Sequence, residues 1–441
     1  MKTILLLGAG LVARPLVRYL LNQKDINLNI VSKPAERAHA LVAGHSRGKV
    51  FDLDVQNKTA VSTLIRSSDL VISLLPYTFH VDIAKLCLAD EKHLITASYL
   101  SHGMIAFDEE AKEKGILLLN EIGLDPGIDH MSAMQIKENI ERRGGRVLSF
   151  ESCCGGLPAP EANDNPFGYK FSWSPRGVLL AGRNSARYRK DGEIIDVPGS
   201  ELFRHRWPKS VNGLGELQVY PNRDSLIYEN MYDLFKSDTF FRGTFRYPGW
   251  SETIEKIIDL GFLSEEEDKS LIGISYSQMM AQFIGMKATR AARIDVADFL
   301  NLEHDSSIMD RLGWLGLFGD DLISHVRPAP IDILTARMLE KMVYRPGERD
   351  MVVLQHDFVA DMGVHKEHIC SLLLDYGEPG GDSSMARTVS LPTAIAANLI
   401  VHDEIDVRGV KIPTNKEIYE PVLAELHHLG ISLQETTRTL P

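Results

Sequence analysis

Short apolar runs alternate with amphipathic stretches through the first 124 residues. The apolar runs predict strands at 3–7, 28–31, 49–54, 69–75, 93–97 and 116–120. Apolar residues three or four apart predict intervening helices, for example at 15–22, 81–89 and 105–113. Strands that are apolar throughout and separated by helices indicate a doubly wound parallel sheet, buried on both faces. Ligands of such sheets bind at the carboxyl ends of the strands.

From about residue 145 the pattern changes. Alternating polar and apolar positions predict strands of a second, more open sheet at 146–153, 219–221, 239–247 and 351–359. Residues 251–324 have helical spacing, with an acidic helix start at 263–267, and the stretches 384–402 and 417–429 are helical again. We expect an α/β fold of three parts: a first domain from 1–124 and 385–441, an α+β mixed-sheet domain from 125–250 and 325–384, and an all-helical insertion at 251–324.

Composition narrows the class of protein. A chain of 441 residues exceeds the usual size of one core, and 44% apolar with 24% charged residues is typical of a globular protein. No apolar run is long enough to cross a bilayer, and the chain opens on a strand rather than a leader, so we expect a cytoplasmic protein. A net charge of −12 argues against nucleic acid as a partner. An anionic substrate would need a local cluster of arginines.

The cysteines predict neither a disulfide framework nor a metal site. There are four, and their spacing matches no zinc motif: Cys87, Cys153, Cys154 and Cys370. We therefore expect no metal.

The first strand runs directly into a glycine-rich turn, Gly8-Ala9-Gly10-Leu11-Val12, followed by a helix. Gly8 permits the tight turn, Gly10 lets backbone N–H groups approach a diphosphate, and Ala13 allows the helix to pack closely on the sheet. The positive end of the helix attracts the anion. A glycine pattern alone can also be a structural turn, but a strand before it and a helix after it favour a dinucleotide site.

The end of the second strand bears on which dinucleotide binds. An NAD-binding protein is expected to have an acidic residue there, whereas this chain has Ser32-Lys33, with Arg37 one helical turn later. These cations can neutralise a 2′-phosphate that a carboxylate would repel, which favours NADP. The alternative is a solvated lysine at the start of a loop.

Four longer strings identify a family. They are 120–130 (NEIGLDPGIDH), 154–161 (CGGLPAPE), 165–174 (NPFGYKFSWS) and 220–225 (YPNRDS). Together they closely resemble saccharopine reductase, the NADP-dependent, L-glutamate-forming saccharopine dehydrogenase family of lysine metabolism. The resemblance covers nearly the whole chain, and the strings lie in loops, where packing alone does not dictate sequence.

The resemblance implies a Rossmann domain built from both termini, a mixed-sheet substrate domain and a helical insertion. It implies the interconversion of saccharopine, NADP and water with L-glutamate, 2-aminoadipate 6-semialdehyde and NADPH, and it suggests a homodimer. Fungal members have Cys-Arg-Thr where this chain has Ser32-Lys33-Pro34. Recognition of the 2′-phosphate is then expected to be weaker, because lysine lacks arginine's paired donors.

The resemblance also implies site residues, position by position. The cofactor contacts would be Gly8, Ala9, Gly10, Leu11, Val12, Ser32, Lys33, Pro34, Asp54, Val55, Leu75, Ala97, Ser98, Leu124, Asp125, Pro126 and Ser174. The substrate contacts would be Ser98, Tyr99, Asp125, Arg223, Thr244, Phe245 and Arg246.

The residue types agree with the chemistry that the resemblance implies. Saccharopine carries three carboxylates, and the guanidinium groups of Arg223 and Arg246 offer paired donors without losing a proton near neutrality. The alternative for each arginine is a structural salt bridge. Hydride loss beside the nitrogen leaves an iminium that water attacks, so later steps move protons.

Three residues are candidates for moving these protons: Tyr99, Asp125 and Cys154. Asp125 could instead cap the helix that follows Pro126, Tyr99 could be an aromatic wall, and Cys154 could be a small inert core residue. We interpret His130 as a capping or packing residue. The methionines Met279, Met280 and Met286 are interpreted as core packing of the helical insertion.

Other functions remain open at this level. A carboxynorspermidine dehydrogenase-like imine reductase would share the scaffold, but its cationic product would favour acids where this chain has arginines. A non-catalytic NADP-binding protein would have no need for the retained Tyr99, Asp125, Arg223 and Arg246. The chain has no room for a lysine–ketoglutarate reductase domain, so such a partner would be a separate polypeptide.

Overall fold

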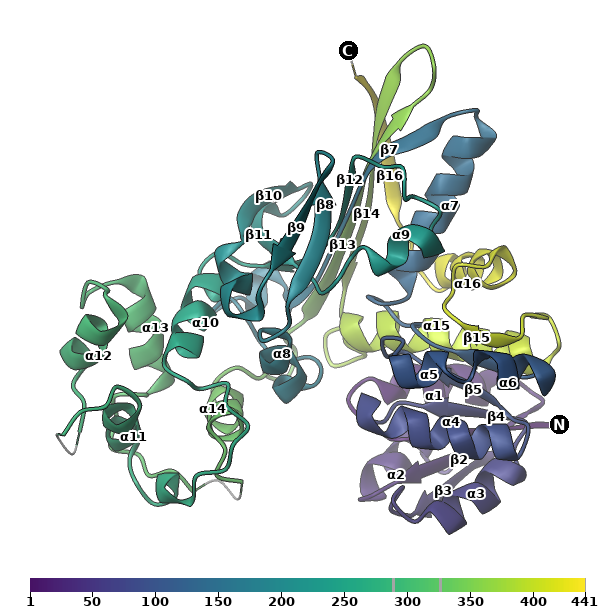
Figure 1. Cartoon of the computed structure of the whole chain (residues 1–441). Coiled ribbons are helices and arrows are strands. Elements are labelled where there is room, and N and C mark those ends of the chain that lie inside the picture. Colours follow the sequence, from purple (N-terminus) through teal and green to yellow (C-terminus); the bar gives the residue numbers. More distant parts are fainter. Residues whose placement is uncertain (288–289, 325–326, 441) are drawn as a thin grey trace. The chain divides into compact units, whose positions relative to one another are not determined.

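The computed structural model describes residues 1–287, 290–324 and 327–440 (Figure 1). Contacts divide the chain into two compact units, Met1–Val147 with Val359–Pro441, and Leu148–Phe358. Residues 125–147 and 359–384 therefore group with the first unit, whereas the sequence pattern places them in the substrate domain. The three-part division stays a prediction.

The first unit contains a seven-stranded sheet with the order β15-β6-β5-β4-β1-β2-β3, and all its neighbouring strands are parallel. This confirms the predicted doubly wound sheet and its use of both ends of the chain. Its strands are β1 (Lys2–Leu7), β2 (Ile26–Ser32), β3 (Gly48–Asp52), β4 (Leu70–Ser73), β5 (His93–Thr96), β6 (Leu117–Leu119) and β15 (Gly409–Lys411).

Helices separate these strands along the chain (Figure 1). They are α1 (Ala13–Asn22), α2 (Glu36–Val42), α3 (Lys58–Arg66), η1 (Tyr77–Phe79), α4 (His80–Ala89), α5 (His102–Ile105), α6 (Asp108–Glu113), α7 (Ile128–Arg142), α15 (Ser384–Val401) and α16 (Lys416–His428). The long α15 packs against α1 and also contacts β4 and β5. This unit also holds the antiparallel pair of β14 (Lys366–Tyr376) and β16 (Gln434–Leu440).

The helix expected over 105–113 is shorter in the structure: α6 covers Asp108–Glu113, and the separate short helix α5 ends at Ile105. Ser101 caps α5 by accepting a hydrogen bond from the N–H of Met104. Asp108 begins α6, and its carboxylate accepts a hydrogen bond from the N–H of Val410, 2.7 Å away. The first residue of the second helix therefore contacts a strand distant in sequence.

The core of the first unit joins the sheet to one layer of helices. Leu5, Leu94 and Leu118 from three strands pack in one cluster with Ile65 of α3 and Cys87 of α4, and all five are fully buried. Alternate strand residues such as Ile4 are also fully buried. Burial of both faces explains why the strands are apolar throughout.

The second unit contains a mixed sheet whose neighbours run in the order β10-β11-β12-β7-β13. The pairs β10–β11 and β11–β12 are antiparallel and β12–β7 is parallel, as the sequence predicted for a mixed sheet. Its strands are β7 (Arg146–Pro158), β8 (Ala186–Lys190), β9 (Glu193–Val197), β10 (Trp207–Val211), β11 (Gly215–Pro221), β12 (Thr239–Arg246) and β13 (Asp350–Asp361). Its short helices are η2 (Pro160–Ala162), α8 (Pro175–Ala181), η3 (Gly199–Arg204) and α9 (Ile227–Met231).

Between residues 250 and 339 the described residues form helices joined by loops, in agreement with the helical spacing over 251–324, whereas the last of these helices, Pro330–Leu339, lies beyond that range. The helices are α10 (Trp250–Asp259), η4 (Lys269–Leu271), α11 (Tyr276–Phe283), α12 (Arg293–Leu300), α13 (Ser307–Leu315) and α14 (Pro330–Leu339). Met279 and Met280 are fully buried, in agreement with core packing, and Met286 is half-buried.

The acidic segment 263–267 does not start a helix, contrary to the expectation from its sequence. Glu265 forms ion pairs with Arg176 and Arg183 at 2.7 and 2.9 Å, and Glu267 forms one with Arg327 at 3.3 Å. The acidic side chains therefore join this loop to neighbouring segments instead of capping a helix.

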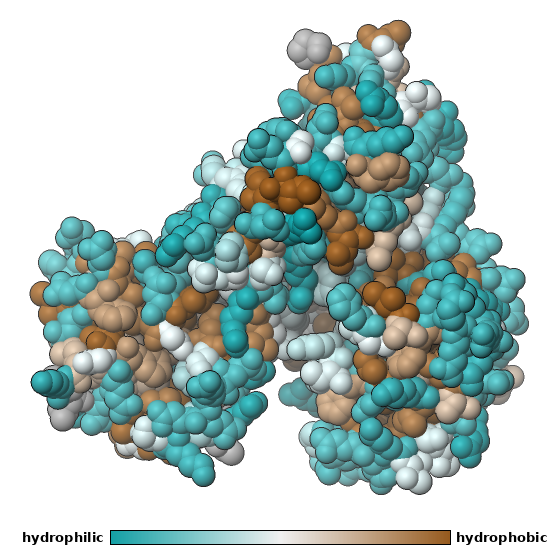
Figure 2. All heavy atoms as spheres, in the orientation of Figure 1, coloured by the Kyte–Doolittle hydropathy of each residue, from teal (hydrophilic) through white to brown (hydrophobic). Residues whose placement is uncertain are grey.

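The molecular surface in view is largely hydrophilic, with smaller hydrophobic patches (Figure 2). Among the described residues, no helix is both long enough and apolar enough to cross a membrane.

Truncating a core side chain of the parallel sheet should destabilise the first unit. Leu118→Ala removes a fully buried side chain and should lower the free energy of unfolding by about 2–5 kcal/mol, because lost burial and a new cavity add. Val364→Ala is the control, since Val364 is 91% exposed, and its change should stay within about 0.5 kcal/mol. Urea unfolding measures both, and equal effects would contradict the assigned core.

Candidate functional site

The glycine-rich turn has the geometry expected of a diphosphate cradle. Gly8 has a φ of 100°, which favours glycine, and a Cβ there would lie 3.2 Å from the carbonyl oxygen of Leu74. A Cβ on Gly10 would meet nothing within 4 Å. The protein itself therefore does not require glycine at position 10, and the open space fits a ligand that approaches the backbone.

The first helix begins at Ala13, which is fully buried, and no described side chain caps its N-terminus. The N–H of Ala13 donates to the carbonyl of Gly10, 3.3 Å away, and Pro15 has no N–H, so Arg14 supplies the first helical N–H that an anion could meet. The neighbouring predicted contacts Ala9, Leu11 and Val12 lie in the same turn, and Leu11 is 59% exposed.

The predicted 2′-phosphate contacts meet at the ends of β2 and β3. Ser32 donates a hydrogen bond to the carbonyl of Pro34, 2.9 Å away, which closes the turn after β2. The ammonium of Lys33 lies 3.4 Å from a carboxylate oxygen of Asp54, and both side chains are largely exposed. A hydrogen bond from the N–H of Gln56, followed by Lys33, lowers the pKa of Asp54. The lysine is thus exposed at the edge where a phosphate would bind.

The other predicted cofactor contacts of the first unit also follow its strands. Val55 comes after β3, Leu75 after β4, Ala97 and Ser98 after β5, and Leu124 to Pro126 after β6. Because parallel strands end at one edge, the sheet brings these positions together. Ser174 belongs to the second unit, where it caps α8 by accepting a hydrogen bond from the N–H of Gly177.

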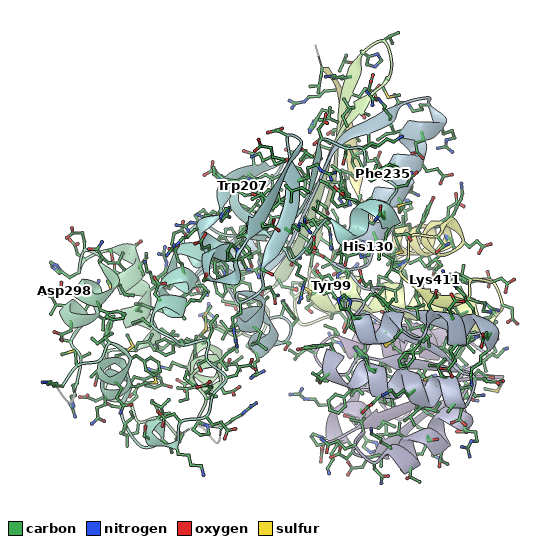
Figure 3. All side chains as sticks on the ribbon, viewed as in Figure 1. Tyr99, His130, Trp207, Phe235, Asp298 and Lys411 are labelled. Carbon is green, nitrogen blue, oxygen red and sulfur yellow. The ribbon has the colours of Figure 1, made fainter. Side chains whose placement is uncertain are left out.

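Two of the three predicted proton carriers are in contact. The hydroxyl of Tyr99 donates a hydrogen bond to a carboxylate oxygen of Asp125, 3.1 Å away. Both residues are half-buried, and Figure 3 labels Tyr99 at this edge of the first unit. Asp125 does not cap the following helix. The cap position of α7 is Gly127, and Asp129 in the first turn accepts a hydrogen bond from the N–H of Gly127.

A buried acid holds the segment that carries Tyr99. Glu121 has a φ of 58° and is 1% exposed. Its N–H donates to the carbonyl of Ser98, and one carboxylate oxygen accepts from the N–H of Leu100 at 2.7 Å. Its second oxygen lies 2.7 Å from Nε2 of His130.

His130 lies in the first turn of α7, labelled in Figure 3, and is fully buried. The packing interpretation of this histidine therefore fits the structure, whereas the capping interpretation does not.

In the second unit Thr244, Arg246 and Cys154 share one face of the sheet. Thr244 and Arg246 are two residues apart on β12, so their side chains point to the same face of the sheet. Cys154 of β7 is opposite Thr244. Cys154 is 5% exposed. A Cβ on the next residue, Gly155, would lie 2.7 Å from the carbonyl oxygen of Phe245, so close strand packing requires a glycine there. The side chain of Phe245 is fully buried on the other face. Only the backbone of Phe245 can therefore contact a ligand that binds beside Arg246.

Arg246 is a buried cation among aromatic rings. It is 5% exposed, and its guanidinium carbon lies 5.0 Å from the ring centroid of Tyr169 and 5.8 Å from those of Tyr220 and Trp250. Nη1 donates to the carbonyl of Phe245, and Nε is buried without a hydrogen-bond partner. Among the described residues, no acidic side chain forms an ion pair with it. A buried charge is normally paired, so this guanidinium is suited to an anion from outside the chain.

Arg223 lies elsewhere on the same strand pair. It is exposed, has a φ of 57°, and follows β11 in a loop whose Asn222 N–H donates to the carbonyl of Arg242. Arg223 therefore lies near the position of Arg242 on β12. Arg242 and Arg246 are four residues apart on this strand, so their backbones are separated by about 13 Å. The backbones of Arg223 and Arg246 are therefore separated along the sheet rather than adjacent.

Sequence reasoning did not single out several polar residues near these positions. His80 contacts Ser98. Gln218 is opposite Arg246 in the strand register, and Arg242 lies on the same face of β12 as Arg246. No spacing motif marks them, since each depends on a partner distant in sequence. A search of the described residues finds no cluster of acids, histidines and cysteines suited to a metal ion.

Comparisons with known proteins agree across the whole chain. Residues 4–119 match the family model "Saccharopine dehydrogenase NADP binding domain", and 123–431 match "Saccharopine dehydrogenase C-terminal domain". Saccharopine dehydrogenase [NADP(+), L-glutamate-forming] of Pyricularia oryzae is 40% identical, over 98% of each chain. The mitochondrial alpha-aminoadipic semialdehyde synthase of Bos taurus is 34% identical, over 98% of this chain and 47% of its own.

A solved structure is similar throughout. The apo saccharopine dehydrogenase (L-Glu forming) of Saccharomyces cerevisiae superposes with a TM-score of 0.89 at 39% identity, over 99% of this chain and 100% of that one. The fold, the family models and these relatives agree, and the chain belongs to the saccharopine dehydrogenase family.

Proposed function

We propose that this protein is an NADP-dependent oxidoreductase that interconverts saccharopine, NADP and water with L-glutamate, 2-aminoadipate 6-semialdehyde and NADPH. The observation that carries the proposal is the buried Arg246, which has no acidic partner among the described residues. Family relatives bear this activity in their names.

The spacing of the cations supports an elongated substrate with several carboxylates. Arg246 would bind one carboxylate within the ring of Tyr169, Tyr220 and Trp250, where water is excluded and the charge interaction is strengthened. Arg223, whose backbone lies about 13 Å away along the sheet, would bind another. Saccharopine carries three carboxylates on an extended chain, so its ends can reach both positions.

The residues of the first unit fit NADP. The turn at 8–12 and the uncapped start of α1 would hold the diphosphate, and Lys33 would meet the 2′-phosphate. When bound, the cofactor supplies the hydride chemistry. The chain's own tasks are to align the reacting C–H bond and to exclude stray water.

Tyr99 and Asp125 would move the protons that follow hydride transfer. Their hydrogen bond joins a phenol to a carboxylate at the sheet edge, so a proton can pass between them. Cys154 would lie on the substrate face beside Thr244. The expectations of a homodimer and of a cytoplasmic location remain predictions that accompany this proposal.

The carboxynorspermidine dehydrogenase-like alternative fits the second unit less well. A product with cationic arms needs acids in its pocket, yet Arg246 places a buried positive charge there. A non-catalytic NADP-binding protein would need neither the Tyr99–Asp125 contact nor Arg246.

A turnover assay tests the proposal directly. The purified protein should oxidise NADPH with L-glutamate plus 2-aminoadipate 6-semialdehyde, followed at 340 nm, and should be much slower with other pairs of amine and carbonyl compound. Turnover of a polyamine-type pair at a higher kcat/KM would favour the imine reductase alternative, and no turnover with any pair would favour the binding protein.

Replacing Arg246 should weaken saccharopine binding selectively. Arg246→Ala should raise the KM for saccharopine about 10- to 100-fold, because it removes charge-assisted hydrogen bonds in a buried pocket. The Kd of NADPH should change little. Arg204→Ala is the matched control, since Arg204 is exposed and forms an ion pair with Glu255 at 3.4 Å. An unchanged KM in Arg246→Ala removes this residue from the substrate site.

Reversing the charge at Lys33 should change the cofactor preference. Lys33→Asp should lower kcat/KM for NADP and raise the relative use of NAD, because a carboxylate repels the 2′-phosphate. Lys112→Asp, at an exposed lysine of α6, is the control, because it changes the net charge of the protein by the same amount. If the ratio of the two cofactors moves equally in both variants, Lys33 does not contact the phosphate.

Removing the charge of Asp125 should slow the chemical step. Asp125→Asn should lower kcat about 10²- to 10⁴-fold, because the amide cannot exchange a proton with Tyr99. Steady-state kinetics and a folding check by circular dichroism measure this. A kcat within threefold of the unaltered protein would assign Asp125 a structural role.

A further inference from the structure

His80 is a buried histidine that the proposed chemistry does not use. It is the first residue of α4, is 3% exposed, and lies where β4 and β5 end. Its ring contacts three hydroxyls: Nδ1 lies 3.1 Å from Oγ of Ser73, and Nε2 lies 3.0 Å from Oγ1 of Thr96 and 2.8 Å from Oγ of Ser98. The shortest contact is to the one half-buried residue of the three, Ser98.

The ring is neutral near neutral pH. Burial lowers the pKa of His80 to about 4, and its hydrogen-bond partners are uncharged hydroxyls. A neutral imidazole has one N–H donor and one acceptor nitrogen. With Nε2 protonated, the ring donates to Ser98 and leaves the serine proton for a ligand. With Nδ1 protonated, Ser98 donates to the ring and presents its oxygen as an acceptor.

Ser98 is also held through its backbone. Its N–H donates to Oγ1 of Thr96 at 3.2 Å, and its carbonyl accepts from the N–H of Glu121 at 3.1 Å. Together with His80, these bonds fix three of its polar atoms. These bonds therefore define the position of the hydroxyl oxygen of Ser98. The next residue in the chain is Tyr99, which donates the hydrogen bond to Asp125.

We propose that His80 is a positioning residue, which acts through the hydroxyl of Ser98 to hold that group toward the bound ligands. The inference rests on the proposed function and on the contacts of Ser98 with cofactor and substrate that the family resemblance implies. The neutral ring adds no charge beside a hydride-transfer centre, and its two tautomers let Ser98 meet either a donor or an acceptor group.

Two conservative variants separate this role from packing. In His80→Gln the terminal amide can occupy the place of Nε2 and keep a bond to Ser98. In His80→Asn the amide occupies the place of Nδ1 and keeps only the bond to Ser73. Cys87→Ala, a fully buried residue of the same helix, controls for a general loss of stability.

We expect His80→Asn to lower kcat with saccharopine about 10- to 100-fold, because a misplaced Ser98 hydroxyl would no longer align the bound ligands for reaction. His80→Gln should remain within about threefold of the unaltered protein, although both variants lower the Tm. Cys87→Ala should lower the Tm without changing kcat per folded molecule. Equal losses of kcat in His80→Gln and His80→Asn, or no loss in His80→Asn, would overturn the assignment.

A binding measurement keeps this test independent of the reaction. If the unaltered protein does not turn over saccharopine, the proposed function fails, and the Kd of NADPH from its fluorescence then decides the role of His80. Weaker binding in His80→Asn by about 2- to 10-fold, restored in His80→Gln, supports a positioning role toward the cofactor. The same Kd in both variants and the unaltered protein contradicts it.

Discussion

The parallel arrangement of seven strands is the constraint on which the first unit depends. Both faces of the sheet are buried, so its polar functional groups can lie only beyond the strand ends. The turn after β1, the Lys33–Asp54 pair and the Tyr99–Asp125 pair all lie at the carboxyl edge for this reason. Loops at that edge can carry a cofactor site while the core remains apolar.

In the second unit the main constraint is the buried charge of Arg246, which has no acidic partner among the described residues. Taking a guanidinium out of water is costly unless it is paired. Around Arg246 the rings of three aromatic residues give partial compensation, and a ligand carboxylate would complete it. A surface arginine with an acidic partner, such as Arg204, would gain little from such a ligand. This difference is the reason to connect Arg246 rather than other arginines with an anionic substrate.

Polar support around Tyr99 comes from residues of several elements. Glu121 holds the backbone on both sides of Tyr99, His130 supports Glu121, and His80 holds the hydroxyl of Ser98. These groups are buried and well partnered, so the segment that carries the predicted proton carriers has little freedom to move. Such fixed geometry is what a hydride-transfer site requires.

The sequence by itself determined the parallel sheet, the diphosphate turn and the family, because apolar periodicity and glycine spacing are local properties of the chain. It did not determine the exposed β16, whose polar residues show no alternation, or the break between α5 and α6, beside which Asp108 contacts Val410. Tertiary structure alone decided that His80 meets Ser98, that Gln218 is opposite Arg246, and that Arg246 has no acidic partner among the described residues. Those facts depend on contacts between residues far apart in sequence, which only the folded chain brings together.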